Sequence, residues 1–514
     1  MILDRIAHQT RQRVAAEQAA LPLAEMRRRA EALGLGRGAD FERALAAGGL
    51  SFICEVKRAS PSKGLIAADF DPVSIARQYA AAGASAISVL TEPEFFLGSD
   101  DYLAQIAAAV TTPTLRKDFV VDPYQIYQAR TLGAAAVLLI CRLLSGTQLA
   151  DWLALAGDLG LACLVETHDQ AEIDQAVTAG ARLIGVNNRD LATFQVDLAL
   201  TERLAGALPD QVTLVAESGV HSPGDVARLR RAGVDAVLVG ERLMTAPDKA
   251  QALDQLRSEL PRIKLCGLSR PQDVAAANQA RPDYVGFVFA PSSRQVDPDQ
   301  ASRLRAQLDP GIAAVGVFVD ADESAIAQLG AAGTIDLIQL HGQESAEQVA
   351  RLRRTAGLRV IKAVRLDRSP GPEVWAAAAA ADAVLLDAGA GSGRRLDWSD
   401  LPVIDKPWFL AGGIDLDNLD QALQVPGHPV LDLSSGAETA GAKDPAKMIA
   451  LTARTHAWGS PRLARRAGWA VHGLYADSSA YADSSEGGDR DWAGRRQAAP
   501  VLDAPSETAG KESS

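Results

Sequence analysis

One repeat constrains the fold of this chain more than any other feature: a short apolar segment followed by a polar turn and a helical stretch. It occurs eight times between residues 51 and 240. The apolar segments are continuous and rich in β-branched residues, as in strands buried on both faces of a parallel sheet. Asp71-Pro72 supplies a helix cap and a first-turn proline, and Gly83 follows the helix end. Eight such units in about 200 residues are typical of a closed (β/α)₈ barrel. The predicted strands span 51–56, 86–90, 114–117, 136–140, 162–166, 182–186, 213–217 and 236–240.

The same pattern restarts at Arg262 and again provides eight strand–helix units. The predicted fold is therefore α/β, with two tandem (β/α)₈ (TIM) barrels over residues 1–258 and 259–456. A doubly wound open sheet would show the same alternation of strands and helices, but the repeated count of eight favours barrels. The second set of predicted strands spans 262–266, 284–289, 313–318, 337–340, 359–363, 383–387, 408–411 and 430–433.

The two ends of the chain differ from the repeat. The first 45 residues are rich in Ala, Arg and Glu and predict helices ahead of the first strand. From residue 457 the apolar content falls, since only five of the last 58 residues are Leu, Ile, Val or Phe. Such a segment buries too little apolar area to offset its ordering entropy, so residues 457–514 are predicted to form a disordered tail.

The composition narrows the classes of partner. The 514 residues carry a net charge of −12, which argues against nucleic-acid or acidic-membrane partners. The four cysteines lie singly, so neither a disulfide framework nor a structural zinc site is expected. The charged N-terminus lacks the apolar core of a signal peptide, and no apolar run approaches the roughly 18 residues of a membrane span. We expect a cytoplasmic, monomeric protein.

Polar side chains end several strands of the first predicted barrel. In a barrel these ends converge on one mouth, where the reactive groups lie. Two lysines and three glutamates there would pair, shift one another's pKa and serve in acid–base chemistry; ordinary strand-end salt bridges are the alternative. The backbone after the seventh and eighth strands is expected to bind a phosphate group. The strand-end residues are Glu55, Lys57, Lys117, Glu166, Asn187, Arg189 and Glu217, and the phosphate-binding ones are Ser218, Gly219 and Gly240.

Strings at nearly every strand end of this barrel resemble those of indole-3-glycerol-phosphate synthases. They include CEVKRASPSKG (54–64), LRKDFVVDPYQIYQAR (115–130), IGVNNRDL (184–191) and VAESGV (215–220). The resemblance covers residues 1 to about 255. It implies closure of a pyrrole ring from a carboxyphenylamino-deoxyribulose phosphate, with loss of CO₂ and water.

The resemblance also implies roles for individual residues. Lys117 would be the general acid, and Glu166 would be the second acid–base group. Lys57 and Glu55 would handle the substrate carboxylate and protons. Glu241-Arg242 departs from the small polar residue expected after the eighth strand. The remaining implied contacts are orienting groups at Asn187 and Glu217, a substrate contact at Arg189, and phosphate contacts at Ser60, Ser218, Gly219 and Gly240.

The second predicted barrel has its own polar strand ends. A lone cysteine at such a place is more often a buried small hydrophobe than a nucleophile. Here Gly267 follows Cys266, and Asp387 ends another strand of the same barrel. A thiolate base facing a carboxylic acid could move a proton between neighbouring carbons, whereas His341 alone fits a hydrogen-bonding role. The candidate residues are Cys266, Arg294, His341 and Asp387, with Gly412, Gly413, Ser434, Ser435 and Gly436 for a phosphate group.

Strings in this half resemble those of phosphoribosylanthranilate isomerases over residues 262–455. They include IKLCGLSRPQDV (263–274), GFVFAPSSRQV (286–296) and LDLSSGAE (431–438). The resemblance implies an Amadori rearrangement of a phosphoribosyl-anthranilate. Cys266 would remove the C2 proton of the sugar, Asp387 would protonate the ring oxygen, and Arg294 would hold the anthranilate carboxylate. Arg394-Arg395 differs from the residues that these isomerases usually have in the loop after Asp387.

The two resemblances support each other, because the isomerase product is the synthase substrate. The predicted function is a bifunctional enzyme for two consecutive steps of tryptophan biosynthesis, acting on small phosphorylated anthranilate-sugar substrates. Neither reaction needs a metal or an organic cofactor, so none is expected. One alternative keeps a single active barrel beside a phosphate-binding remnant. Another, a regulatory protein that binds phosphosugars, would not need the acid–base sets of either barrel.

Overall fold

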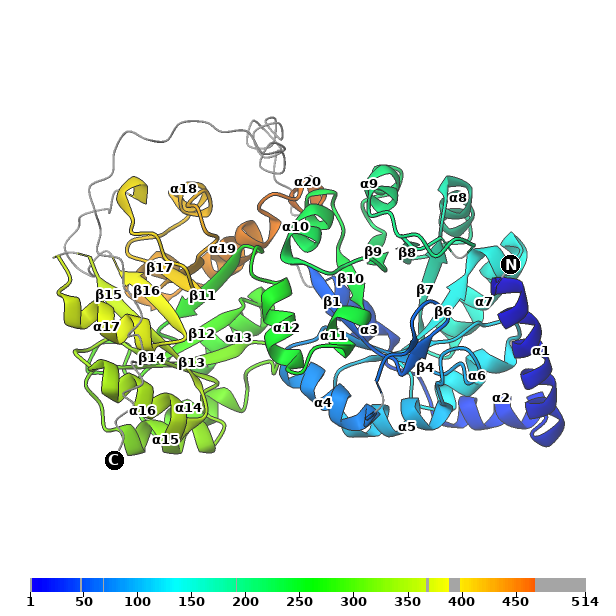
Figure 1. The fold of residues 1–514 in the computed structure, drawn as a ribbon, viewed down its shortest axis with the longest axis horizontal. Helices are drawn as coiled ribbons and strands as arrows, with labels where there is room; N and C mark the ends of the chain where they lie inside the picture. Colours follow the sequence, from blue (N-terminus) through cyan, green and yellow to red (C-terminus); the bar gives the residue numbers. More distant parts are fainter. Residues whose placement is uncertain are drawn as a thin grey trace, which may run out of the picture. The chain divides into compact units, whose positions relative to one another are not determined.

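The structure is a computed structural model that describes residues 2–46, 49–67, 69–190, 192–366, 369–387 and 398–466. Its long strands form two closed eight-stranded barrels, one after the other along the chain (Figure 1). The predicted fold of two tandem (β/α)₈ barrels is therefore confirmed, and the open doubly wound sheet is excluded. Among the described residues, no helix is both long and apolar enough to cross a lipid bilayer.

Eight parallel strands close the first barrel. They are β1 (Ser51–Val56), β4 (Ala86–Leu90), β5 (Thr114–Lys117), β6 (Ala136–Ile140), β7 (Ala162–Thr167), β8 (Leu183–Asn187), β9 (Thr213–Glu217) and β10 (Ala236–Val239). Their order around the barrel is β1-β10-β9-β8-β7-β6-β5-β4, and Ser51 of β1 lies opposite Ala236 of β10 where the barrel closes. Nearly all of their residues are buried, because side chains fill the interior and helices cover the outside.

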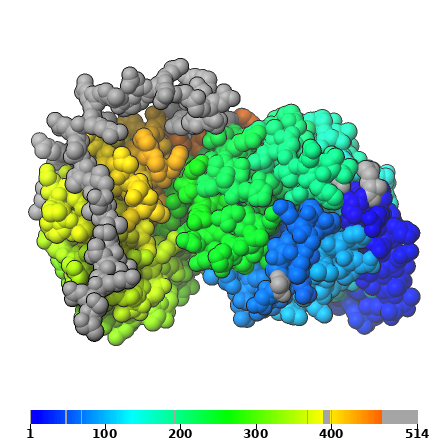
Figure 2. All heavy atoms as spheres, in the orientation of Figure 1, coloured from blue at the N-terminus to red at the C-terminus, as the bar shows by residue number. Residues whose placement is uncertain are grey.

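Helices surround this barrel, and three of them precede its first strand, as predicted. They are α1 (Ile2–Ala20), α2 (Leu23–Ala32), α3 (Gly38–Leu45), α4 (Pro72–Ala81), α5 (Asp100–Ala109), α6 (Tyr124–Thr131), α7 (Gly146–Asp158), α8 (Gln170–Thr178), α9 (Ala199–Ala205), α10 (Pro223–Arg231), α11 (Glu241–Met244) and α12 (Lys249–Leu256), with the 3₁₀ helix η1 (Cys141–Leu143). The predicted cap before α4 forms, since Asp71 accepts hydrogen bonds from the backbone N–H groups of Val73 and Ser74. Helices α1 and α2, dark blue in Figure 2, both contact α6.

The second barrel repeats the arrangement. Its strands are β11 (Arg262–Cys266), β12 (Tyr284–Val288), β13 (Ala313–Phe318), β14 (Leu337–Leu340), β15 (Arg359–Arg365), β16 (Ala383–Asp387), β17 (Trp408–Ala411) and β18 (Val430–Leu433). Each strand lies beside the next in sequence, and the pairing of β11 with β18 closes the barrel. Its helices are α13 (Pro271–Ala280), α14 (Pro298–Arg305), α15 (Glu323–Ala331), α16 (Ala346–Ala356), α17 (Pro372–Ala380), α18 (Leu419–Leu423) and α19 (Pro445–Ala457), with the 3₁₀ helices η2 (Trp398–Asp400) and η3 (Ser435–Ala437).

Two small antiparallel hairpins were not predicted. One joins β2 (Ala59–Ser60) to β3 (Gly64–Leu65) directly after β1, and the other joins β19 (Glu438–Thr439) to β20 (Ala442–Lys443) after η3. Each strand has two residues, which is too short to leave a periodic pattern in the sequence. Both hairpins follow the C-terminal end of a barrel strand, so both contribute to a barrel mouth.

The predicted start of the disordered tail at residue 457 is wrong for the first ten residues. Ala457 ends α19, and α20 (Pro461–Arg466) follows (Figure 1). Leu463 and Ala464 are buried, and the buried guanidinium of Arg462 donates to the carbonyl oxygens of Pro209 (2.8 Å) and Val212 in the first barrel. Counting apolar residues misses such a segment, because an arginine that binds backbone carbonyls stabilises it. Residues 467–514 lie outside the described residues.

Candidate active sites

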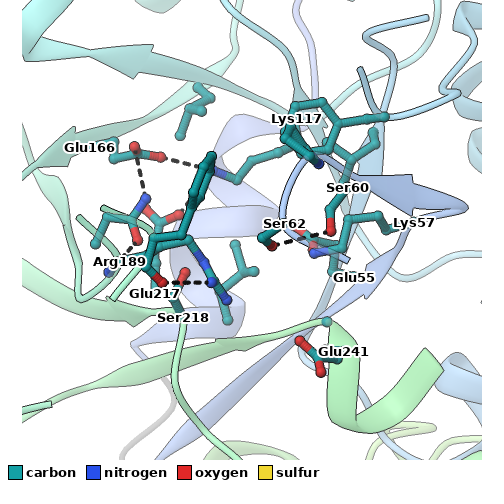
Figure 3. Close-up of a pocket in the computed structure, with 18 of the residues that line it drawn as sticks. Glu55, Lys57, Ser60, Ser62, Lys117, Glu166, Arg189, Glu217, Ser218 and Glu241 are labelled. Carbon is teal, nitrogen blue, oxygen red and sulfur yellow. Dashed lines mark hydrogen bonds and ion pairs between the residues drawn. The ribbon is translucent and has the colours of Figure 1, made fainter. Parts of the chain in front are cut away.

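The mouth of the first barrel brings together the charged strand ends that the sequence singled out. Lys117, at the end of β5, lies between two carboxylates: its Nζ is 2.9 Å from Glu166 Oε2 and 3.0 Å from Glu217 Oε2 (Figure 3). Asn187, at the end of β8, donates from Nδ2 to Glu166 Oε1 at 3.1 Å. Each group ends a parallel strand, and the barrel geometry turns these ends toward one another.

Burial and charge shift the pKa values of this cluster in opposite directions. Burial disfavours the Lys117 ammonium, but the surrounding carboxylates, Glu166 first, raise the pKa of Lys117 well above its ordinary value. Burial also disfavours the ionised form of Glu166, yet Lys117 and His168 lower its pKa to about 2. For Glu217, burial outweighs the attraction of Lys117 and, with repulsion by Glu166, raises the pKa to about 7. The cluster therefore pairs an ammonium with one carboxylate that stays ionised and one that can carry a proton near neutral pH.

Glu55 and Lys57, near the end of β1, form a second ion pair at the same mouth. They lie against Gly240, directly after the neighbouring strand β10, where an added Cβ would lie 2.4 Å from Glu55 Oε1 and 3.0 Å from Lys57 Nζ. A side chain at this position would therefore displace the pair. Arg189, beyond β8, lines the same cavity, and its Nη1 donates to the carbonyl oxygen of Phe194 at 3.3 Å.

The residues expected to bind phosphate also line this cavity, whose volume is about 150 Å³. Ser218 and Gly219, after β9, both have positive φ (65° and 90°), which turns the backbone sharply after the strand. Ser60, in the first hairpin, lies 3.5 Å from Ser62 between their hydroxyl oxygens (Figure 3). Glu241, at the unexpected Glu-Arg position, pairs with Lys63 of that hairpin at 3.1 Å.

Sequence reasoning missed two parts of this site. His168 lies just beyond β7, with Nε2 3.4 Å from Glu166 Oε1 and Nδ1 3.1 Å from Glu172 Oε2. Its place two residues after a strand-end glutamate is a signal that could have been used. The other part is α1, whose apolar residues Ile2, Leu3 and Ile6 line the cavity. No local pattern predicts that contact, because it depends on how the N-terminal helix packs across the barrel.

In the second barrel, Cys266 and Asp387 end β11 and β16, as predicted, and both are buried. Burial is the main cause that raises the pKa of the Cys266 thiol above its ordinary value, and Lys264 opposes this rise. His341 directly follows β14, and its Nε2 lies 3.2 Å from Asp387 Oδ2. The predicted hydrogen-bonding histidine is therefore placed against the predicted acid. The loop with Arg394-Arg395 lies outside the described residues.

Arg294 and the glycine and serine loops complete this mouth. The guanidinium of Arg294 forms a bidentate ion pair with Glu438 of β19, in which Nε and Nη2 donate to the two carboxylate oxygens at 2.7 and 2.8 Å. Gly267 allows this approach, because an added Cβ there would lie 2.5 Å from Arg294 Cδ. This ion pair uses two of the five N–H donors of Arg294, so the others can bind another group. The phosphate candidates follow the neighbouring strands β17 and β18, at Gly412, Gly413, Ser434, Ser435 and Gly436.

Close packing fixes the loops that carry these phosphate candidates. An added Cβ on Gly436 would lie 1.9 Å from the carbonyl oxygen of Ile414, so the loops after β17 and β18 touch through backbone. Asn418 donates to the carbonyl oxygen of Gly413 at 2.8 Å, and Lys443 donates to that of Ser434 at 2.8 Å. Within the described ranges, no group of three or more His, Cys, Asp or Glu side chains is placed to hold a metal ion.

Comparison with known proteins assigns each barrel to a family. Residues 3–256 match the family described as "Indole-3-glycerol phosphate synthase", and residues 263–454 match "N-(5'phosphoribosyl)anthranilate (PRA) isomerase". The indole-3-glycerol phosphate synthase of Ruminiclostridium cellulolyticum is 49% identical over 257 residues, which are 50% of this chain and 99% of that protein. The "Tryptophan biosynthesis protein TrpCF" of Yersinia pestis is 38% identical over 419 residues, which are 80% of this chain and 86% of that protein.

A crystal structure of phosphoribosyl anthranilate isomerase from Thermus thermophilus is also similar, with 36% sequence identity and a TM-score of 0.34. The match covers 38% of this chain and 97% of that one. The two family matches meet between the barrels, and the Yersinia pestis relative spans both of them. The chain therefore belongs to the bifunctional tryptophan-biosynthesis enzymes that carry indole-3-glycerol-phosphate synthase in the first barrel and phosphoribosylanthranilate isomerase in the second.

Proposed function

We propose that the two barrel mouths use the strand-end residues described above for two consecutive reactions. The second barrel isomerises N-(5-phosphoribosyl)anthranilate to 1-(2-carboxyphenylamino)-1-deoxyribulose 5-phosphate. The first barrel converts this product to indole-3-glycerol phosphate, with loss of CO₂ and water. Both substrates carry a carboxylate and a phosphate, which suits two mouths that combine cationic side chains with glycine and serine loops.

In the synthase barrel, Lys117 is the general acid. It donates a proton to the ketone oxygen while the aromatic carbon that bears the carboxylate bonds to the carbonyl carbon. Release of CO₂ restores the aromatic ring. Glu166, ionised and therefore the base of the second acid–base step, then removes a proton from the sugar carbon next to the nitrogen, while the new hydroxyl takes up a proton and leaves as water. Asn187 and Glu217 orient these two groups. The observation that carries this assignment is the ammonium of Lys117 held within 3.0 Å of two buried carboxylates.

The other synthase residues bind substrate. The ammonium of Lys57, beside Glu55, faces the substrate carboxylate, and Arg189 contacts the substrate from the rim after β8. The phosphate group lies against Ser60, Ser218, Gly219 and Gly240. Backbone N–H groups bind the phosphate, so the neighbouring carboxylate of Glu241 does not prevent binding. The ion pair between Glu241 and Lys63 also offsets the negative charge of this carboxylate.

In the isomerase barrel, Asp387 donates a proton to the furanose ring oxygen, which opens the ring. Cys266, as thiolate, then removes the proton from C2, and the resulting enol form rearranges to the ketone. Arg294 holds the anthranilate carboxylate through donors that Glu438 leaves unused. His341 hydrogen-bonds Asp387, while Gly412, Gly413, Ser434, Ser435 and Gly436 bind the phosphate. Complete acid–base sets in both mouths support two active barrels over one active barrel beside a phosphate-binding remnant.

The test is turnover of each intermediate by the purified protein, followed by indole fluorescence, with Lys117→Ala as the critical variant. Removal of a general acid costs about 10²–10⁴-fold in rate, so we expect synthase turnover to fall by that factor. Isomerase turnover should stay parental, because Lys117 belongs to the other barrel. Near-parental synthase turnover in a folded Lys117→Ala protein would reject the assignment of the acid.

A further inference from the structure

A line of hydrogen bonds crosses the interior of the isomerase barrel and ends at Asp387. It starts at Lys264 of β11, which is fully buried (0% exposed) and whose Nζ donates to Gln339 Oε1 of β14 at 2.8 Å. Gln339 Nε2 lies 3.1 Å from His341 Nδ1, and His341 Nε2 lies 3.2 Å from Asp387 Oδ2. Strands β11 and β14 are not neighbours in the barrel, so the lysine side chain spans its interior.

The lysine is held in its charged form by the neighbouring strand. Its Nζ also donates to Asp432 Oδ2 of β18 at 2.8 Å. Burial is the largest single influence and disfavours the ammonium, but Asp432 and Cys266 together raise the pKa of Lys264 above its ordinary value. The same ammonium also interacts with the thiol of Cys266, two residues further along β11. Lys264 thus contacts the proposed base and begins the chain that reaches the proposed acid.

Donor and acceptor capacity fixes the direction of every bond in this chain. An ammonium has three donors and no acceptor, so the amide atom of Gln339 that faces Lys264 must be its oxygen. The amide NH₂ group of Gln339 then faces His341 and donates to Nδ1. Since Nδ1 accepts a hydrogen bond, the neutral imidazole carries its proton on Nε2, and that N–H donates to Asp387.

We propose that Lys264 and Gln339 are positioning residues of the isomerase, which lock His341 in its neutral Nε2–H tautomer and so keep the acid proton of Asp387 available to substrate. This inference rests on the role proposed for Asp387. With Oδ2 accepting from His341, the proton that Asp387 donates is carried by Oδ1. In the opposite tautomer, Nε2 would be a lone pair facing the carboxylic acid and would compete with the ring oxygen for its proton.

The direct test is ¹⁵N NMR of the histidine imidazoles, which reports which ring nitrogen carries a proton without requiring activity. The chain has seven histidines, and the signal of His341 is assigned by its loss in His341→Gln. We expect the parent protein to show His341 protonated on Nε2 alone. In Gln339→Glu, which keeps the shape and the pairing with Lys264, an acceptor replaces the donor, so Nδ1 of His341 should gain a proton.

The kinetic readout is the isomerase kcat, which should fall in Gln339→Glu and in Lys264→Met by the roughly 10–100-fold typical of lost supporting hydrogen bonds around a reactive group. Synthase turnover should be parental in both variants. Lys406→Met is the control, because Lys406 precedes β17 and donates to the carbonyl oxygens of Ala379 and Ala381 at 2.9 and 3.0 Å rather than to residues beside His341. This variant removes the same kind of side chain from the isomerase barrel, but it should leave the His341 signal and its tautomer unchanged.

Two results would contradict the proposal that Lys264 and Gln339 fix the tautomer of His341. One is a parent His341 protonated on Nδ1, and the other is a near-parental isomerase kcat in Gln339→Glu despite a changed tautomer. Asp387→Asn separates this failure from failure of the proposed function. An active Asp387→Asn enzyme would contradict the role of Asp387 as the acid. If Asp387→Asn is inactive but the parent protein carries the His341 proton on Nδ1, only the proposed role of Lys264 and Gln339 is contradicted.

Discussion

The four cysteines of this chain differ in how far their surroundings raise the pKa of the thiol. Burial raises the pKa of Cys54, Cys163 and Cys141 to about 12, so these thiols stay protonated at ordinary pH. Burial also raises the pKa of Cys266, but the ammonium groups of Lys264 and Lys443 oppose that rise. The thiolate is the nucleophile in alkylation, so Cys266 is the residue expected to react with iodoacetamide.

We predict that alkylation abolishes isomerase turnover, leaves synthase turnover intact, and accelerates as pH rises. Because the pKa of Cys266 lies above its ordinary value, the thiolate fraction grows about tenfold per pH unit below that pKa. The measurement is the inactivation rate at several pH values, with mass-spectrometric mapping of the modified cysteine. Cys266→Ser is the control, which should lose isomerase turnover and resist modification. Loss of synthase activity in parallel, or a rate independent of pH, would contradict the assignment.

A glycine behind the synthase cluster allows a second prediction at the residue scale. An added Cβ on Gly185 of β8 would lie 2.2 Å from Glu217 Oε1, and Glu217 is held by Lys117 on its other oxygen. Gly185→Ala should therefore displace the carboxylate and lower synthase kcat, by up to about 10²-fold for a shift near 1 Å. Overpacking should also cost about 1–3 kcal/mol of stability.

The matched control is Gly157→Ala in α7, where an added Cβ meets no atom within 4 Å. That variant should gain about 0.5–1 kcal/mol, because alanine favours the helix more than glycine does, and should keep its synthase kcat. Activity and thermal unfolding of the two variants give the comparison. Equal synthase kcat in both would show that the position of Glu217 does not limit the reaction.

At the scale of elements, the sequence predicted the strands and helices that leave a periodic pattern. It did not predict very short strands or contacts between residues far apart in the sequence. The buried strands were placed to within two residues at each end, because continuous apolar runs and capping residues mark them. Strand-end residues such as Lys117 and Glu166 could be found for the same reason. The two-residue hairpins and the contact of α1 with the synthase cavity could not, since neither leaves a local pattern.

The segment around α20 is an element whose contribution can be measured. Leu463 and Ala464 are buried there, and Arg462 binds carbonyl oxygens of the first barrel. A chain ending at Thr455 should therefore melt several degrees below a chain ending at Arg466. Full burial of one leucine side chain is worth about 1.5–3 kcal/mol, and each kcal/mol shifts Tm by about 2–4 °C in domains of this size.

Point variants separate the buried contact from the exposed one. Arg462→Ala should lower Tm, because it removes hydrogen bonds to the carbonyl oxygens of Pro209 and Val212 at a largely buried contact. Arg465→Ala removes only an exposed ion pair with Asp210 and should change stability by less than about 1 kcal/mol. Equal Tm values for the chains ending at Thr455 and Arg466 would show that α20 adds nothing to the fold.

At the scale of the whole molecule, the two barrels are joined by more than the chain between them. Arg230 of α10 donates to the carbonyl oxygen of His456 in α19 at 2.5 Å, and Arg359 of β15 pairs with Asp254 of α12. The proposed catalytic groups of the two mouths, however, come from separate strand sets. Stability is therefore expected to be shared between the barrels, whereas each reaction should depend on its own barrel.

Mixing two inactive variants tests that separation. Lys117→Ala should still convert phosphoribosylanthranilate to the open-chain intermediate, which accumulates, and Cys266→Ser should convert only that intermediate. Neither variant alone should form indole-3-glycerol phosphate from the first substrate. Together, at parental concentration of each intact site, they should restore the two-step conversion, because the intermediate can leave one molecule and enter another. The measurement is indole fluorescence from the first substrate, with each variant alone as the control. If both single activities persist but the mixture stays inactive, transfer must occur within one molecule, and the barrels do not act independently.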